Sequence, residues 1–264
     1  MGLIEKGQIY ASNSFGDFVV LEDLCNSKYK IKFINTGYET IVSSAAILGG
    51  RVKDKYVPNI AGVGFLGSFE GKVTAPNVII FYRPWNDMMN RCYNVTDEDY
   101  PMYGALGITV DPRWYNFGNF FEDAKTLPGY ENKLREPTMY NLDKDYLQQD
   151  VPDNQKVYSK DTCVWLSRYD NTVLMGKKSY NNLYYGVIQS ESGNYVARFN
   201  HKHIGTFNNA IAAANAYNHV RRISCMGTQK YRTIDMYNDV PYMSPSEYMK
   251  YNTKAKEMIK IIDK

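Results

Sequence analysis

Residues 183–222 read LYYGVIQSESGNYVARFNHKHIGTFNNAIAAANAYNHVRR, and this stretch decides the fold expected for the C-terminal part of the chain. It contains three short runs rich in β-branched and aromatic residues, separated by turn residues at 192–194 and 200–201. The runs are 183–190, 194–200 and 202–208. An alanine-rich segment follows from Asn208, whose side chain can cap the N-terminus of a helix. The pattern predicts a three-stranded sheet followed by one helix.

Positive charge is concentrated in the same region. The whole chain has a formal net charge of only +3, yet residues 177–232 carry eight basic residues against one acidic residue, Glu191. The eight are Lys177, Lys178, Arg198, Lys202, Arg221, Arg222, Lys230 and Arg232. This asymmetry indicates a segment that contacts a polyanion, although a solvated basic face has the same composition.

Four sequence elements of this region resemble the APETALA/ethylene-response-factor DNA-binding domain, which also occurs attached to HNH homing endonucleases. They are Tyr185-Gly186-Val187, residues 194–199 (NYVARF), residues 204–207 (IGTF), and alanines 210, 213, 214 and 216 followed by Tyr217-Asn218. The resemblance implies a sheet that lies in the major groove of duplex DNA, with the helix packed behind it. A twisted ribbon of strands has the dimensions for that role.

The resemblance and the charges together give candidate DNA contacts. Arg198, on the expected middle strand, is the best candidate for a base edge or an adjacent phosphate. Further candidates for bases or backbone are Tyr195, His201, Lys202 and His203, where the histidines can equally be surface turn residues. Candidates for phosphate contacts, which position a protein without reading sequence, are Lys177, Lys178, Arg221 and Arg222. Duplex DNA is therefore the expected partner.

Residues 78–175 have a different character. Apolar residues recur at helical spacing in residues 80–93, with Pro84 in the expected first turn. They are Phe81, Trp85, Met88 or Met89, and Cys92. Residues 116–127 predict a second helix, and a turn with a short strand lies between the two. Aromatic residues at helical spacing usually pack in a core, so no binding role is assigned to them.

Five signatures in this segment resemble those of phage-type HNH endonucleases. In chain order they are Trp85-x-x-Met88-x-x-Arg91-Cys92-Tyr93; Tyr103-Gly104 with Gly107-Ile108-Thr109-Val110; Trp114-x-x-Phe117-x-x-Phe120; Leu142-Asp143-Lys144-Asp145; and Tyr158-Ser159-x-x-x-Cys163-Val164-Trp165. The resemblance implies a ββα-metal core, in which a hairpin and a helix surround one divalent cation.

The resemblance also implies the residues of a metal site. In that family an aspartate binds the metal, a following histidine is the general base, and a histidine or asparagine of the next helix completes the site. By position, Asp143 would be the first ligand, Asn171 the second, and Asp145 a reserve ligand if the register differs by two. The expected cofactor of an active site is Mg²⁺ or another divalent metal, because hard cations take carboxylate and amide oxygens.

Lys144 stands where the family has its histidine. An unperturbed lysine titrates at about pH 10.4, and two neighbouring aspartates favour its charged form, so it is a poor base. It can instead hold the scissile phosphate. Three functions stay open: a DNA endonuclease that nicks one strand, an inactive DNA-binding or regulatory protein with the same fold, and a protein-interaction factor.

Residues 1–75 read as strands. The candidate strands are 18–24, 29–35 and 38–48, with Asn35-Thr36-Gly37 as a hairpin turn between the last two. The glycine-rich run 61–67 lacks the Lys-Ser/Thr of a phosphate loop and is expected to be a strand or a loop. The segment predicts a small β-barrel-like module, and it also resembles the β-rich leader found before such phage HNH cores.

The C-terminal tail has a helix signal of its own. Ser244-Pro245-Ser246-Glu247 is a capping box, and an apolar stripe continues to Ile262. Such a helix can fold back on the body or mediate a homodimer or another protein contact. The four cysteines form no C-x-x-C pair, and no stretch of 18 apolar residues occurs. The expected location is the cytoplasm, that of the host cell if the protein is viral, with no membrane partner.

The expected fold class is therefore α+β, in four parts. They are a β-rich N-terminal module (1–75), a ββα-metal, HNH-like nuclease core (78–175), a DNA-binding module with a three-stranded sheet and a helix (180–232), and a tail with a helix (233–264).

Overall fold

The computed structural model describes residues 4–179, 183–225 and 237–253, but only the backbone of 175–179 and 225. They divide into two compact units of mixed α and β structure, each treated by itself below. The first unit comprises residues 1–124 and 152–157, and the second comprises 125–151 and 158–264. Over the described ranges, helices long and apolar enough to cross a membrane are absent.

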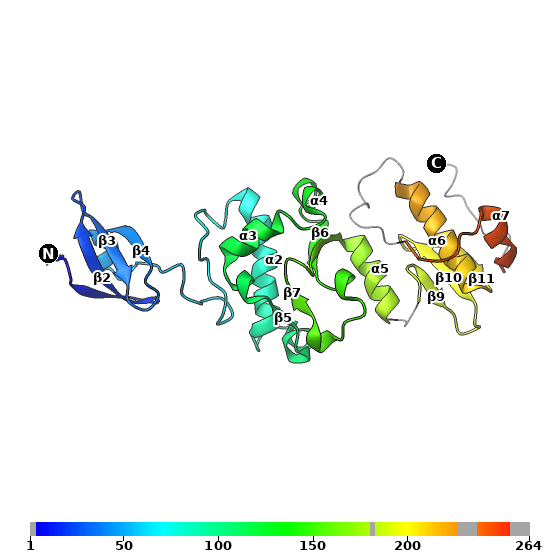
Figure 1. The fold of residues 1–264 in the computed structure, drawn as a ribbon, viewed down its shortest axis with the longest axis horizontal. Coiled ribbons are helices and arrows are strands. Elements are labelled where there is room, and N and C mark those ends of the chain that lie inside the picture. Colours follow the sequence, from blue (N-terminus) through cyan, green and yellow to red (C-terminus); the bar gives the residue numbers. More distant parts are fainter. Residues whose placement is uncertain (1–3, 180–182, 226–236, 254–264) are drawn as a thin grey trace. The chain divides into compact units, whose positions relative to one another are not determined.

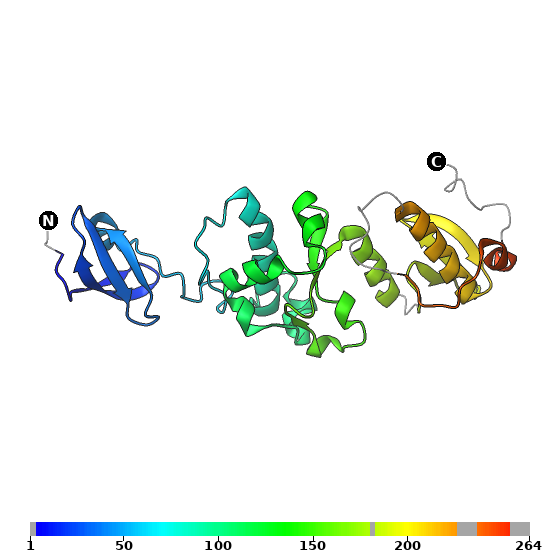
Figure 2. The same cartoon turned by 45° about the horizontal axis from the view of Figure 1, so that its top comes forward.

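The first unit begins with an antiparallel sheet in the order β1-β2-β3-β4, drawn in blue in Figures 1 and 2. Its strands are β1 (Ile9–Ser12), β2 (Gly16–Asp23), β3 (Lys28–Phe33) and β4 (Glu39–Ser43). Alternate side chains on β2 and β3 point to one buried face, where Phe18 and Phe33 lie with ring centroids 5.5 Å apart. The alternation expected of a half-buried sheet is therefore present.

This sheet is open, so the expected barrel-like closure is not observed in the described residues. The reason lies in residues 44–48, which we expected to continue the third candidate strand. They form helix α1 (Ser44–Leu48), because the Ser43 side chain accepts the Ala46 N–H (3.3 Å) and Ala45-Ala46 favour a helix. β4 therefore ends at Ser43.

One predicted turn of this unit is confirmed, and the glycine-rich run, predicted as a strand or a loop, is a loop. Gly37 has φ 71° and donates its N–H to the Phe33 carbonyl (3.0 Å), which closes the hairpin between β3 and β4. The glycine-rich run 61–67 is a loop with an isolated bridge between Ile60 and Gly64.

Helix α2 (Pro76–Tyr93) is longer than predicted and buries the predicted stripe, including Phe81, Trp85 and Cys92. Pro76, rather than Pro84, occupies the first turn, and Pro84 lies inside the helix. Proline has no N–H, so Pro84 removes one helical hydrogen bond there. The remaining helices and strand of this part are η1 (Tyr100–Met102), η2 (Gly104–Leu106), β5 (Thr109–Val110), η3 (Pro112–Tyr115), α3 (Phe117–Ala124) and η5 (Asp153–Gln155).

The second unit contains a two-stranded antiparallel ladder followed directly by a helix. Its elements are α4 (Tyr130–Arg135), β6 (Tyr140–Asp143), η4 (Tyr146–Gln148), β8 (Val164–Ser167) and α5 (Arg168–Ser179). Strand β7 (Val157–Tyr158) lies where the chain passes from the first unit to the second. Asp143 at the end of β6 is opposite Val164, and Tyr140 is opposite Ser167. The predicted helix carrying Asn171 is thus observed.

The predicted three-stranded sheet and its helix are also observed. Strands β9 (Val187–Gln189), β10 (Tyr195–Phe199) and β11 (Lys202–Phe207) are antiparallel in the order β11-β10-β9, and helix α6 (Ala210–Cys225) packs on one face (Figure 1). Alanines of α6 are buried in the same core cluster as the strands; they are Ala212, Ala213, Ala214 and Ala216. Small side chains allow the helix to lie close to the strands.

The turns of this sheet follow the predicted chemistry, with one correction at the helix. Asn200 (φ 48°) and His201 (φ 61°) form a two-residue loop with both residues left-handed, as the twist of a hairpin favours. The helix cap is Asn209 and not Asn208. Its Oδ1 accepts the Ala212 N–H (2.9 Å), because the helix begins one residue later than predicted.

The hydrophobic core does not stop at the predicted boundary between residues 175 and 180. One cluster of buried side chains joins Val164 and Leu166 of β8 and Leu174 of α5 with the sheet and α6. The ββα segment and the three-stranded sheet are therefore parts of one folded unit.

The described part of the tail folds back on this unit. The capping box at Ser244 and Glu247 begins helix α7 (Pro245–Tyr248), which is followed by η7 (Met249–Tyr251). Tyr248 is buried against Phe207, and Thr253 donates its N–H to the Thr206 carbonyl (2.8 Å). The predicted continuation of the helix beyond residue 253 lies outside the described residues.

Candidate nucleic-acid interface and candidate metal centre

The three-stranded sheet has one face on α6 and one face turned away from it. Ala197 and Phe199 of β10 are buried on the helix side, whereas Arg198 between them is exposed on the other side. A register shift between Ala197 and Arg198 places Arg198 opposite His203 of β11. Opposite residues in a ladder have neighbouring side chains, so the Arg198 guanidinium and the His203 ring lie side by side on the outward face.

Four exposed residues form what we call the basic turn: Arg198, His201, Lys202 and His203. In the described ranges none of the four makes an ion pair, and the only hydrogen bond from their side chains joins His203 Nε2 to Thr206 Oγ1 (3.0 Å). Glu191 lies in the turn at the opposite end of β10. The basic turn therefore keeps its positive charge available to a ligand in solution.

Tyr195 differs from the other predicted contacts. It is half-buried on the helix side of the sheet, packs against the core, and accepts a hydrogen bond from Gln189 Nε2 at 3.4 Å. Its position opposite Phe207 follows from strand alternation, which places residues 195, 197 and 199 on one face. Tyr195 is therefore outside the basic turn.

Arg221 is placed where it does not face solvent. It is 1% exposed, and its Nη1 lies 2.9 Å from Asp170 Oδ1 and 3.4 Å from the Tyr217 hydroxyl. Burial raises the pKa of Asp170, and the Arg221 guanidinium opposes that rise. This ion pair joins α5 to α6, so Arg221 is not available as the predicted phosphate contact in this arrangement.

Of the other three predicted phosphate contacts, one is exposed, and the side chains of the other two lie outside the described residues. Arg222, the neighbour of Arg221 on α6, is exposed. Lys177 and Lys178 lie on α5, but their side chains are outside the described residues, as are Lys230 and Arg232.

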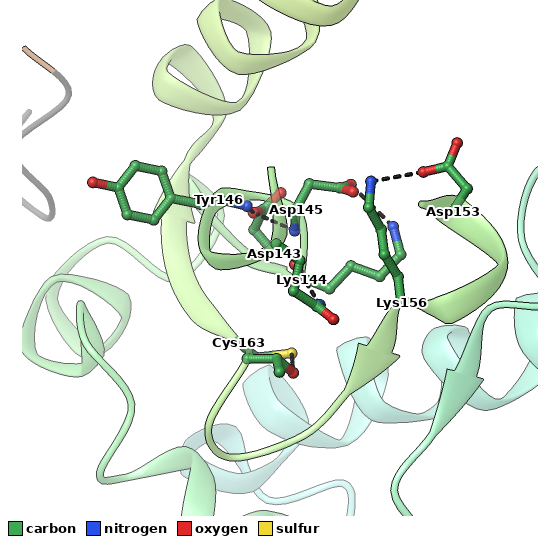
Figure 3. A network of polar contacts seen from close by, with 9 residues as sticks. Asp143, Lys144, Asp145, Tyr146, Asp153, Lys156 and Cys163 are labelled. Carbon is green, nitrogen blue, oxygen red and sulfur yellow. Dashed lines mark hydrogen bonds and ion pairs between the residues drawn. The ribbon is translucent and has the colours of Figure 1, made fainter. Parts of the chain in front are cut away.

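Asp143 is buried and already accepts two hydrogen bonds. Its Oδ1 accepts the backbone N–H groups of Asp145 (3.0 Å) and Tyr146 (2.8 Å), so the carboxylate holds the turn into η4 (Figure 3). Burial raises the pKa of Asp143, while those N–H groups and Lys144 act in the opposite direction. The local sequence explains the position, because an aspartate after a strand readily hydrogen-bonds the backbone two or three residues on.

Lys144 is buried beside the two aspartates. It is 4% exposed, its Nζ lies 3.0 Å from Asp145 Oδ2, and it lies 5.4 Å from the centre of the Tyr158 ring. Cys163 is also buried nearby, and burial raises the pKa of its thiol to about 12 (Figure 3). The Lys144 ammonium group is thus paired with Asp145, the reserve metal ligand. Cys163, in turn, is a neutral thiol at physiological pH.

The predicted donors fit a divalent cation only in part. In the described part of the chain, Asp143 Oδ2 accepts no hydrogen bond, which leaves one carboxylate oxygen for a metal. Asn171 is half-buried on α5, and no hydrogen bond joins it to Asp143 within the described ranges. A group of three or more His, Cys, Asp and Glu side chains suited to a metal is likewise absent there.

Sequence reasoning missed Asp170, the completely buried partner of Arg221. The two residues are 51 positions apart, and a single sequence carries no signal for such a pairing. No family model, curated protein or solved structure matches the chain. The two family resemblances therefore remain predictions.

Proposed function

We propose that the chain binds duplex DNA through the basic turn of its three-stranded sheet. The observation that carries this proposal is the side-by-side exposure of Arg198 and His203 on the outward face of β10 and β11. Lys202, at the start of β11, and His201, in the loop before it, are exposed beside them. Phosphates attract such a cluster, and guanidinium groups also recognise guanine edges.

The shape and packing of the three-stranded sheet support DNA binding. A strand pair has the width to enter the major groove, and α6 holds the pair from behind through buried alanines. The two-residue loop at Asn200 and His201 keeps the turn short and fixed. Counterion release then makes the affinity fall as the salt concentration rises.

The test is a titration of labelled duplex DNA with the full chain, followed by fluorescence anisotropy at several salt concentrations. Arg198→Ala should weaken binding by about tenfold, the loss expected of one good arginine contact. Arg135→Ala, an exposed arginine on α4 of the same unit, is the matched control and should bind like the wild type. Equal affinities of the two variants would reject the basic turn as the interface.

A second candidate function is metal-dependent hydrolysis of one DNA strand. The order β6, β8, α5, with Asp143 at the end of the first strand, favours it. Asp143 and Asn171 would hold a divalent cation, which activates water and stabilises charge on a phosphate. Lys144 would contact the scissile phosphate, which requires its Nζ to leave Asp145 Oδ2.

A plasmid-nicking assay with Mg²⁺ or Mn²⁺, and with EDTA as the metal-free control, separates the two candidates. The informative variant is Asp143→Asn, because an asparagine keeps an oxygen for the Asp145 and Tyr146 N–H groups while losing the charge. Asp239→Asn, a change at an exposed aspartate of the same unit, is its control. Nicking that Asp143→Asn abolishes supports an endonuclease. DNA binding without nicking supports a DNA-binding protein that does not cut.

A further inference from the structure

A groove runs between helix α5 and the outward face of the three-stranded sheet, on the β9 side of that face. It has a volume of about 280 Å³. Tyr169, Thr172 and Val173 of α5 form one wall, and the sheet wall includes Ile188, Arg198 and His201. All of these residues belong to the second unit, so the groove is a feature of one folded body.

The α5 wall is fixed in place. The Tyr169 hydroxyl accepts the backbone N–H of Asn200 at 2.7 Å, and its ring meets Phe199 edge to face at 5.3 Å. Thr172 donates its hydroxyl to the Arg168 carbonyl of its own helix (2.9 Å). The groove is therefore held open by contacts between α5 and β10, and a ligand would enter a preformed site.

The lining has two chemically different parts. Val173 and Ile188 give an apolar surface beside the Tyr169 ring, while Arg198 brings positive charge and His201 brings ring nitrogens that can hydrogen-bond. Among the residues that the structure describes, the groove lining contains no acidic side chain and Arg198 has no polar partner. A flat, weakly polar ring joined to an anion matches both parts, and a nucleotide consists of those two groups.

The size limits how much of a nucleic acid can enter. A volume of about 280 Å³ lies just below the usual range for small-molecule sites. It suits one base with its phosphate and is too small for a stacked base pair.

We propose that this groove receives one unstacked nucleotide of a DNA strand, with its base between Val173 and Ile188 and its phosphate on Arg198. The inference rests on the proposed DNA binding and adds to it the form of DNA that the protein prefers. Lys202 and His203, outside the groove, would contact the flanking duplex.

The experiment compares an intact duplex with the same duplex carrying one unpaired thymidine, by fluorescence anisotropy with the full chain. The unpaired thymidine should raise the affinity about tenfold, since stacking one base on protein contributes that order of free energy. Thr172→Trp fills the groove from an exposed helix position and should remove the preference while leaving the affinity for intact duplex unchanged. Thr172→Ala leaves the groove open and should keep the preference.

Ser192→Trp, in the turn between β9 and β10 and outside the groove, is the matched control and should keep the preference. Binding of both DNAs with equal affinity by the wild type would overturn the inference and leave the proposed DNA binding standing. Binding of neither DNA would overturn both. A preference that survives Thr172→Trp, or free thymidine 5′-monophosphate binding as tightly as the DNA with the unpaired base, would also overturn the inference.

Discussion

At the scale of single residues, the ion pair between Asp170 and Arg221 is the most deeply buried pair of opposite charges in the described residues. Removing one partner leaves an uncompensated charge in the core. Arg221→Met should therefore lower the free energy of unfolding by about 3–5 kcal/mol, measured by urea denaturation. Arg222→Met changes the adjacent exposed arginine and should stay within about 0.5 kcal/mol of the wild type. Equal effects of the two changes would mean that the pair does not hold α5 to α6.

Gly186 is the second residue whose replacement tests the packing of this unit. It has φ 65°, and a Cβ at this position would lie 2.2 Å from the Tyr217 ring. Gly186→Ala should cost about 2–4 kcal/mol, because it combines backbone strain with overpacking against a buried ring. Gly193 has φ 82° and no atom within 4 Å of its Cβ position, so Gly193→Ala should cost only about 1 kcal/mol. A similar loss from both changes, in the same urea titration, would contradict this packing.

At the scale of helices and strands, the capping box of α7 gives a pH dependence. Hydrogen bonds from the side chain and backbone N–H of Ser244 hold the pKa of Glu247 below its usual value. The stabilisation is complete above the ordinary glutamate pKa and is lost as the pH falls through the lowered value.

Amide protection at Tyr248 and Met249 should therefore decrease on acidification below about pH 4.5, after correction for intrinsic exchange rates. Hydrogen exchange followed by mass spectrometry measures it. Glu247→Gln should make the protection independent of pH in this range. If the variant kept the wild-type pH profile, another group would control the helix.

The helices and strands also separate what a single sequence can predict from what it cannot. The strands and turns between Tyr195 and Phe207 were predictable, because alternation and the left-handed preference of Asn200 are local signals. The start of α2 at Pro76 was missed, since Pro84 carries the same signal eight positions later. The burial of Lys144 beside Asp145 was not predicted, because the charged sequence Asp143-Lys144-Asp145 carries no local signal for a buried position.

At the scale of the whole chain, the shared core predicts how the protein can be divided. Val164, Leu166 and Leu174 belong to the cluster that also contains the three-stranded sheet and α6. A fragment of residues 125–264 keeps that cluster intact, whereas a fragment of residues 180–264 removes three of its members and the Asp170 partner of Arg221.

The longer fragment should therefore unfold cooperatively in urea, and the shorter one should show a broad transition with a lower midpoint. Each large apolar side chain lost from a core costs about 2–5 kcal/mol, and a small domain has few to spare. The measurement is the circular dichroism of each fragment as a function of urea concentration, at equal protein concentrations. If residues 180–264 unfolded as sharply and at the same urea concentration as 125–264, the sheet and α6 would be an independent domain, and the contacts of α5 with them would be dispensable for folding.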